Sequence, residues 1–268
     1  MIMPLYTANQ PLFFPLIYMM ERFARVDHLV IMEEAQFTKF GHQARVQLAT
    51  RTGLVTTVLP LQDRAFKALD QVLVHDPGRW AGKIKKQMQT IYGRQPGYKA
   101  DMGGRFDVLI DNLVEEDGPL TAARVGSASI RWLCALAGLA CYIHRSTELV
   151  PERPCDPTMW IAAFGTALRA RAYLGGETAM RAYVDKSLFD ARGIALVVQD
   201  YRVPAYRQLH TGSLFDQAFN PMVSALDPLF IGGPALLQEL IGAQLGAGDT
   251  NRSMRHWEPV ASPLEVPA

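Results

Sequence analysis

Apolar positions in the first part of the chain predict a strand, a loop, a helix and a second strand. Residues 2–8 favour a strand that the turn-forming sequence NQP ends. The segment PLIYMMERFARV, which starts at Pro15, repeats its apolar positions at helical spacing. The apolar run HLVIM at 28–32 is too short for a helix and is typical of a buried strand.

The pattern then changes to two β-rich segments that flank RTG. They predict a hairpin of 44–50 and 54–61 with its turn at Thr52 and Gly53. Further along, amphipathic segments alternate with short apolar runs. Helices are expected at 79–93, 105–115, 127–137, 158–171, 185–192 and 234–245, with a short helix entered from FNPMVSALDPLFIGG. Strands are expected within AGLACYIH, in AYLGG before a glycine loop, and in IALVVQDY.

This interleaving predicts an α/β or α+β fold, in which helices flank a mixed sheet within a single compact domain. The domain is expected to cover residues 1–245 and shows no internal repeat. Residues 246–268 are rich in Gly, Pro and Ser and have no apolar period, so they are expected to form a flexible C-terminal tail.

Composition narrows the class of protein. With 268 residues, 49% of them hydrophobic, the chain can bury a substantial core. Its 27 Lys and Arg nearly balance 26 Asp and Glu, so no nucleic-acid partner is expected. Prolines interrupt the apolar start, no basic segment precedes it, and no long apolar run follows, so neither a signal peptide nor a membrane span is predicted. Three cysteines without a C-x-x-C pair fit a cytoplasmic protein.

Polar side chains are dense directly after the second expected strand, in EEAQFTKFGHQAR at 33–45. Ligands of open α/β sheets bind beyond the carboxyl ends of strands, so these groups have a reason to face a site. Glu34 and Gln36 would share a side of a continuing strand, with Lys39 and His42 in the loop that follows. An imidazole titrates near neutrality, which makes His42 a candidate base. A solvated loop explains the same density equally well.

Other candidate chemistry is sparse. Cys155 lies before an expected helix N-terminus, which favours a thiolate, although Asp156 opposes it and an exposed linker cysteine is the alternative. Cys134 and Cys141 fit buried apolar positions. The six histidines show no metal-ligand spacing, so no metal site is predicted.

Glycine pairs and one turn-forming segment near residue 220 allow two interpretations each. No glycine pair belongs to G-x-G-x-x-G or to a P-loop; YLGGET is either an anion-binding loop or a tight turn. In NPMVSALD, Ser224 and Asp227 would share one helix face near Asn220. Either these three residues line a site or Asn220 caps a helix.

Taken in order, four segments resemble the WbqC-like family over residues 5–240. They are NQPLFFPLIYMMERFARVDHLVIMEEAQFTKFG, WLCALAGLACYIHRSTEL, LRARAYLGGETAMRAYVDKSLFDARGIALVVQDYRVPAYRQ and FNPMVSALDPLFIGG. The matching positions are Gln10, Pro11, Pro15, Glu33, Glu34, Gln36, Lys39, Arg45, Gly175, Gly176, Tyr183, Asp185, Asp200, Tyr201, Pro204, Ser224 and Asp227.

The chain also departs from that family pattern. Ala44, Val46 and Gln47 stand where polar or basic residues are expected, and glutamates stand at 33 and 34 where aspartate is usual. Glu177 and Thr178 replace a further small and glycine-rich stretch.

The resemblance implies acyl or aminoacyl transfer, or thioester hydrolysis, in a bacterial specialised-metabolite or polysaccharide pathway. Such chemistry needs a nucleophile, a base and an oxyanion donor. The catalytic candidates are His42, Cys155 and Glu34. The substrate-binding candidates are Gln10, Gln36, Lys39, Arg45, Asn220, Ser224 and Asp227. A small-molecule substrate and an acyl or peptidyl carrier protein are the expected partners, and no cofactor is expected.

Two alternatives remain open. The opening strand, loop, helix and strand have the layout of nucleotide-binding α/β folds, with Lys39 and Arg45 available for phosphates, so an ATP-dependent amide-forming or nucleotidyl-transferring enzyme fits as well. A noncatalytic carrier-protein adaptor is the third hypothesis. It predicts that a basic surface at Lys83, Lys85 and Lys86 matters, whereas His42 and Cys155 do not.

Overall fold

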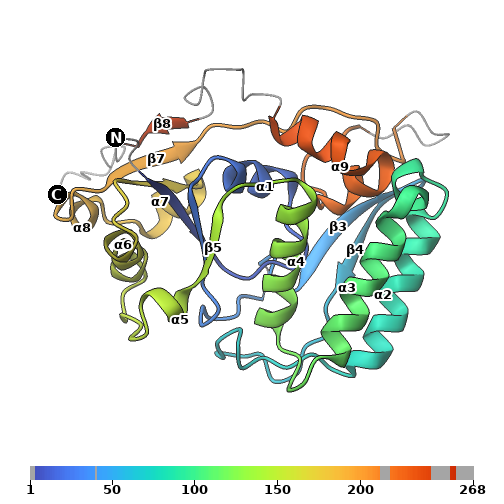
Figure 1. Ribbon diagram of the computed structural model, residues 1–268, viewed down its shortest axis with the longest axis horizontal. Coiled ribbons are helices and arrows are strands. Elements are labelled where there is room, and N and C mark those ends of the chain that lie inside the picture. The colour runs from blue at the N-terminus through green and yellow to red at the C-terminus, as the bar shows by residue number, and fades with distance from the viewer. Residues whose placement is uncertain (1–3, 40, 212–217, 243–253, 258–268) are drawn as a thin grey trace, which may run out of the picture.

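A computed structural model describes residues 4–39, 41–211, 218–242 and 254–257 (Figure 1). Its larger sheet has the strand order β5-β2-β1-β6-β7-β8. Five of these strands run parallel, and β8 pairs antiparallel with β7 at one edge. The strands are β1 (Leu5–Asn9), β2 (His28–Ile31), β5 (Tyr142–Arg145), β6 (Ala172–Gly175), β7 (Ala195–Gln199) and β8 (Met254–His256).

Helices connect the parallel strands, and a separate hairpin follows β2. The hairpin consists of β3 (Arg45–Thr50) and β4 (Gly53–Val58). The helices are α1 (Ile17–Ala24), α2 (Pro77–Tyr92), the π-helical turn η1 (Tyr98–Met102), α3 (Gly103–Glu115), α4 (Ala122–Leu136), α5 (Ser146–Leu149), α6 (Pro157–Ala167), α7 (Glu177–Tyr183), α8 (Lys186–Asp190) and α9 (Leu226–Gly242).

Strand β1 is covered on both faces because its side chains alternate between them. On one face, the Tyr6 hydroxyl donates to the Ile161 carbonyl of α6 at 2.8 Å. On the other face, Asn9 accepts a hydrogen bond from Arg22 of α1. Helices therefore pack on both sides of a largely parallel sheet, which is the arrangement of a doubly wound α/β fold.

The chain changes direction across the sheet at β1. From β1 it passes to β2 and β5 on one side, and then returns to β6 and β7 on the other. The ladder between β1 and β2 continues to Asn9 opposite Ile31, whereas the ladder between β1 and β6 holds only Leu5 opposite Ala172 and Tyr6 opposite Tyr173. The carboxyl ends of β1 and β6 lie at this switch point, where open α/β sheets bind ligands.

The hairpin, α2, α3 and α9 form a second packed unit beside the sheet (Figure 1). Its centre is aromatic: the Phe106 ring lies 5.6 Å from that of Phe230 and 5.5 Å from that of Phe14. Phe14 comes from the loop of residues 10–16 between β1 and α1. One continuous hydrophobic core thus joins the sheet to the hairpin unit, which makes the described chain a single compact domain.

The α/β prediction is confirmed, and the elements differ from expectation in a few places. The hairpin turn is Arg51 and Thr52, one residue earlier than predicted. Residues 177–183 form α7 where a loop was expected, and α9 continues through Pro234 with a kink at Gly233, whose φ is 77°. Within the expected flexible tail, residues 254–256 form β8, and Trp257 follows it as a buried residue. Residues 246–253 and 258–268, like 1–3 and 243–245, lie outside the described residues.

Of the helices in the described part of the chain, none combines the length and apolar character that crossing a bilayer requires.

Helix α4 packs directly against the loop of residues 10–16, and a glycine permits that contact. A Cβ on Gly126 would lie 2.7 Å from the carbonyl carbon of Pro11 and 2.8 Å from the backbone nitrogen of Leu12. Backbone atoms cannot move aside as a flexible side chain can. We therefore expect Gly126→Ala to lower the free energy of unfolding by about 1–3 kcal/mol despite the better helix propensity of alanine.

The matched control is Gly82→Ala in α2, where nothing lies within 4 Å of the added Cβ. That change should raise the free energy of unfolding by about 0.5–1 kcal/mol through helix propensity alone. Urea denaturation followed by tryptophan fluorescence measures both. Equal stability changes in the two variants would contradict the close packing of α4 on the loop.

Candidate functional site

The carboxyl ends of the parallel strands carry most of the polar groups of the candidate site. Asn9 ends β1 and Gln10 follows it, while Glu33 and Glu34 come just after β2. Ser146 follows β5 directly. Since parallel strands end at the same edge of a sheet, these side chains share one edge of the molecule, and it is the edge at which α/β folds bind ligands.

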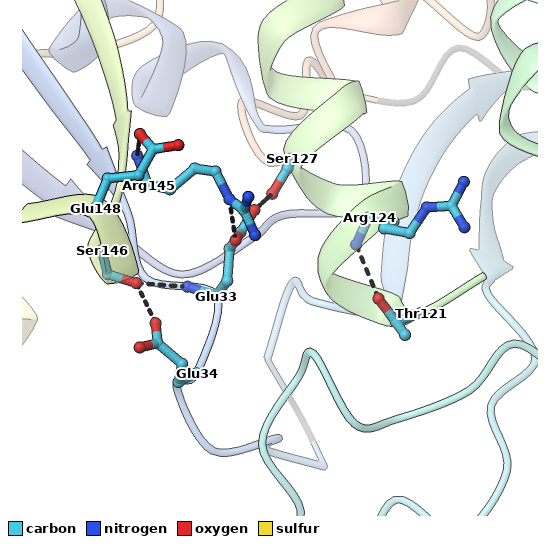
Figure 2. A network of polar contacts seen from close by, with 8 residues as sticks. All are labelled: Glu33, Glu34, Thr121, Arg124, Ser127, Arg145, Ser146 and Glu148. Carbon is cyan, nitrogen blue, oxygen red and sulfur yellow. Dashed lines mark hydrogen bonds and ion pairs between the residues drawn. The ribbon is translucent and has the colours of Figure 1, made fainter. Parts of the chain in front are cut away.

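Glu33 links three elements through its carboxylate (Figure 2). Arg145 at the end of β5 forms an ion pair with it at 2.7 Å, and the Ser127 hydroxyl of α4 donates to its other oxygen at 3.0 Å. The backbone N–H of Glu33 donates to the Ser146 hydroxyl oxygen at 3.2 Å. Glu33 is buried, and these partners satisfy both carboxylate oxygens. Its role in this arrangement is to hold β2, β5 and α4 together.

Glu34 faces the opposite direction and is only half-buried. The Ser146 hydroxyl donates a short hydrogen bond to its carboxylate, and the Arg153 guanidinium donates to its backbone carbonyl. Burial, followed by the charge of Glu34, raises the pKa of the nearby Asp70 carboxyl. Arg153 belongs to the linker before α6 that also carries Cys155, so this linker is attached to the edge at Glu34. Cys155 itself is exposed.

A buried glutamine orders the loop after Glu34. Gln43 is 1% exposed, and its Oε1 accepts a hydrogen bond from the backbone N–H of Thr38 at 2.7 Å. Because a backbone N–H can only donate, this contact fixes which end of the Gln43 amide is oxygen. Its Nε2 must then donate, and it does so to Oε1 of Gln10 and to the carbonyl of Gln36. Loop 36–43 is thereby tied to the end of β1.

His42 precedes Gln43 in this loop and is half-buried. Its carbonyl accepts a hydrogen bond from the Phe13 backbone N–H at 2.9 Å. Burial lowers the pKa of the His42 imidazole, so the neutral form prevails at neutral pH and can accept a proton.

The predicted site residues divide into two groups. Gln10 and the backbone carbonyl of Gln36 are joined through Gln43, and His42 precedes Gln43 in the same loop. Glu34 lies just after β2 and contacts Ser146 and Arg153 instead, and Lys39 is exposed. Arg45 is exposed at the first position of β3. Within the described residues, no hydrogen bond joins His42 to Cys155 or to Glu34. The three catalytic candidates therefore do not form a preassembled triad.

Ser224 and Asp227 have internal partners instead. Both are fully buried. The Ser224 hydroxyl donates to the Phe14 carbonyl at 3.1 Å, and the carboxylate oxygens of Asp227 accept from the hydroxyls of Tyr92 and Tyr206, each at 2.6 Å. These bonds attach α9 to the loop of residues 10–16, to α2 and to the segment before α9. As they lie here, neither side chain is accessible to a substrate.

Asn220, which was predicted with Ser224 and Asp227, stabilises a turn. Its side-chain oxygen accepts from the Met222 backbone N–H at 2.7 Å, and its own backbone N–H donates to Gln208 at 2.9 Å. Since α9 begins at Leu226, this turn precedes the helix rather than capping it.

Several residues at the edge have little or no signal in the sequence. Gln43 belongs to a polar run in which His42 is the more conspicuous residue, and Ser127 and Arg145 lie far from Glu33 in the chain. Ser146 has a signal, because it opens the STEL of the second matching segment. Arg22, a buried arginine of α1 that donates to Asn9 at 2.7 Å, has none, because a polar position in an amphipathic helix is interpreted as a surface residue.

In the described part of the chain, no group of three or more His, Cys, Asp or Glu side chains is arranged to hold a metal ion. Two ring nitrogens of His28 and His144 lie 3.1 Å apart on β2 and β5.

Comparison with known proteins gives two findings. The WbqC-like protein family matches residues 10–239. The uncharacterized protein Rv1507c of Mycobacterium tuberculosis is 26% identical over 210 residues, which cover 77% of this chain and 84% of that protein. The family match begins at Gln10, directly after β1, and includes the ends of β2 and β5, Gln43 and nearly all of α9.

The buried carboxyl of Asp227 generates a prediction about stability and pH. Burial raises its pKa to about 6, although the two tyrosine hydroxyls act against this. When the folded pKa exceeds that of the unfolded chain, the unfolded state loses its proton first as the pH rises. Asp227 therefore costs stability as the pH rises from about 4 to about 6. At about 1.36 kcal/mol per pH unit, the full cost is roughly 3 kcal/mol.

The comparison is with Asp227→Asn, which cannot ionise. The free energy of unfolding of the wild type minus that of the variant should fall between pH 4 and pH 6 and stay constant above pH 7. Urea denaturation of both proteins across this range measures the difference. Parallel curves would mean that Asp227 is ionised in the folded state with an ordinary pKa.

Proposed function

The chain belongs to the WbqC-like protein family, and on this premise we propose that it is an acyl-thioester-processing enzyme, a hydrolase or an acyl or aminoacyl transferase. Its substrate is a small acyl group on an acyl or peptidyl carrier protein, in a bacterial specialised-metabolite or polysaccharide pathway. The reaction takes place at the carboxyl edge of the parallel sheet. The observation that carries the proposal is the oriented amide of Gln10.

The orientation of Gln10 follows from its contact with Gln43. Gln43 donates through Nε2, so the Gln10 atom that it meets is the oxygen, Oε1. Within the described residues, the Nε2 of Gln10 forms no hydrogen bond, and the side chain is partly exposed. An amide donor that is fixed by a buried neighbour and free to donate is suited to an oxyanion, because it needs no reorganisation during the reaction.

The chemistry needs a proton acceptor beside this donor. His42 is adjacent to Gln43, and burial lowers the pKa of its imidazole, which keeps the imidazole neutral at pH 7. In hydrolysis, His42 takes a proton from water as its oxygen attacks the thioester carbon, and the carbonyl oxygen becomes an oxyanion stabilised by Gln10. The carbon–sulfur bond then breaks, and the proton passes from His42 to the departing thiolate.

Cys155 offers a second route that leads to transfer. Its thiol attacks the thioester, the carrier thiol leaves, and the acyl group on sulfur then passes to an amine, a hydroxyl or water. The linker that holds Cys155 is attached to Glu34 through Arg153. Since no hydrogen bond joins Cys155 to His42 in the described residues, this route requires the linker to move toward the loop of residues 36–43.

A basic groove provides a docking surface for the carrier protein. It has a volume of about 1010 Å³ and lies between the hairpin turn and α2. Its lining includes Arg51, Lys83, Lys86 and Arg94 and no acidic residue. Within the described residues, none of these four cations forms an ion pair, whereas Lys85 points away and pairs with Asp111 at 2.5 Å. The charge is complementary to an acidic carrier surface.

The groove and the edge lie at opposite ends of β3. Arg45 opens β3 just after the loop of residues 36–43, and Thr50 closes it at the groove. Five residue steps of about 3.3 Å separate them by roughly 17 Å. A carrier protein in the groove therefore needs a long flexible prosthetic arm to deliver its acyl group to Gln10.

Turnover of thioesters tests the proposal. Acyl-pantetheines and acyl carrier proteins are incubated with the protein, and free thiol is measured. Gln10→Ala should lower kcat about 10²–10³-fold through loss of an oxyanion donor, and His42→Ala about 10²–10⁴-fold through loss of a base. His75→Ala is the control, because His75 is an exposed histidine whose ring contacts Gln62 and none of the candidate site residues.

Folded wild-type protein that turns over no member of the panel would contradict the proposal. Turnover that depends on ATP would favour the amide-forming or nucleotidyl-transferring alternative. Cys155→Ala separates the two routes, since hydrolysis by water does not need the thiol.

Charge reversal tests the docking groove separately. Lys83→Glu together with Lys86→Glu should raise KM for carrier-protein substrates about tenfold, a difference of about 1.4 kcal/mol, and leave turnover of acyl-pantetheines unchanged. The control pair, Arg171→Glu with Arg207→Glu, changes net charge equally at exposed sites away from the groove. An equal effect of both pairs would show that only net charge matters. Loss of pathway output in the groove variant alone, with full output from His42→Ala and Cys155→Ala, would make the protein an adaptor.

A further inference from the structure

A buried arginine without a carboxylate partner lies at the switch point of the sheet. Arg22 is 7% exposed, and its Nη2 donates to the side-chain oxygen of Asn9 at 2.7 Å. Its Nε is buried and has no hydrogen-bond partner. A guanidinium carries five N–H groups, and within the described residues that of Arg22 forms only this one bond and no ion pair. Charge buried in this way is unfavourable unless something pairs with it.

Arg25, the C-cap residue of α1, is neutralised by a carboxylate, as buried arginines usually are. Arg25 pairs with Glu21 at 2.6 Å, and both side chains are almost completely buried. The other oxygen of Glu21 accepts a hydrogen bond from Gln199 of β7. The carboxylate nearest in sequence to Arg22 is therefore already engaged by other groups. In the described residues, Arg25 is therefore paired with a carboxylate, and Arg22 is not.

Gly176, the residue between β6 and α7, packs against the Arg22 guanidinium. A Cβ on Gly176 would lie 2.7 Å from Nη1 of Arg22. Any residue other than glycine would therefore displace the guanidinium from its present position. Asn9 and Gly176 are both partly exposed, which brings the charge close to solvent between the ends of β1 and β6. The ladder between these two strands has already ended at Tyr6 and Tyr173.

We propose that Arg22 binds an oxyanion of the substrate, a phosphoryl or carboxylate group, between the carboxyl ends of β1 and β6. The planar fork of a guanidinium matches two oxygens of either group, and a low dielectric strengthens the pairing. Asn9 is a positioning residue: its oxygen accepts from Nη2 and fixes the plane of the fork. Gln10 follows Asn9 directly, so the site lies at the same end of β1 as the oriented amide of Gln10. The site requires no thioester chemistry and is tested without it.

Binding of simple anions tests the site. The midpoint of thermal unfolding and the heat of titration are measured with sodium phosphate and with sodium succinate, each against sodium chloride at equal ionic strength. We expect a saturable rise of the midpoint in the wild type with phosphate or with succinate. The anion that acts identifies the chemical group: phosphate indicates a phosphorylated ligand, and succinate a carboxylate.

Three variants assign the effect to Arg22. Arg22→Met keeps the apolar contacts and removes the charge, and it should weaken anion binding at least tenfold. Gly176→Ala displaces the guanidinium by its new Cβ and should also weaken binding, although Arg22 is still present. Arg171→Met removes an exposed arginine just before β6, and this variant should bind the anion as the wild type does.

The proposal is overturned if folded wild-type protein responds to neither anion beyond the chloride control, or if Arg22→Met binds as well as the wild type. Circular dichroism establishes that each variant is folded. If Arg22→Met does not fold, Gly176→Ala decides, and unchanged binding in that variant rejects the site. The measurement is binding of phosphate or succinate, so its outcome does not depend on thioester activity. A protein without thioester activity can bind the anion, and a protein with thioester activity can lack the anion site.

Discussion

The loop of residues 10–16, between β1 and α1, is the constraint on which the rest of the structure depends. Residues 11–16 are all buried, and several packed elements make backbone contact with them. The Phe13 N–H donates to the carbonyl of His42, and the Pro15 carbonyl accepts from the segment entering α9. Gly126 lets α4 lie against Pro11. This one loop therefore fixes the positions of His42, of α4, of α9 and of α1, the helix that carries Arg22.

The burial of this loop also explains how the fold can bind an anion without a glycine-rich phosphate loop. In dinucleotide-binding folds, glycines after the first strand let backbone N–H groups approach a phosphate. Here the same position holds phenylalanines, and Phe14 has a φ of 52°, a conformation that costs about 1–3 kcal/mol and is offset by burial of its ring. The backbone that follows β1 is buried in the core and therefore does not approach a ligand. Recognition of charge at the switch point then falls to a side chain, and Arg22 is the one that reaches it.

The sequence predicts the elements better than it predicts the site. Strands β1 and β2 and the hairpin have patterns that burial alone explains, whereas α7 follows two glycines that suggested a loop, and β8 is an edge strand without apolar alternation. At the site, the density of polar residues at 33–45 is visible in the sequence, but its organisation is not. Gln43 orders its loop by accepting a hydrogen bond from the backbone N–H of Thr38. Glu33 connects elements by binding Ser127 and Arg145, which lie about a hundred residues away in the chain. Such roles depend on tertiary contacts, which periodicity does not encode.

Glu33 and Glu34 are adjacent in the sequence, and their partners separate their roles. Both oxygens of Glu33 are occupied, by Arg145 and by Ser127, and the ion pair with Arg145 joins two strands. In the described part of the chain, the Ser146 hydroxyl is the hydrogen-bond partner of the Glu34 carboxylate, whose charge helps to raise the pKa of the Asp70 carboxyl. Of the pair, Glu34 is therefore the carboxylate that stays half-buried at the edge, and Glu33 is the one that holds the strand end in place.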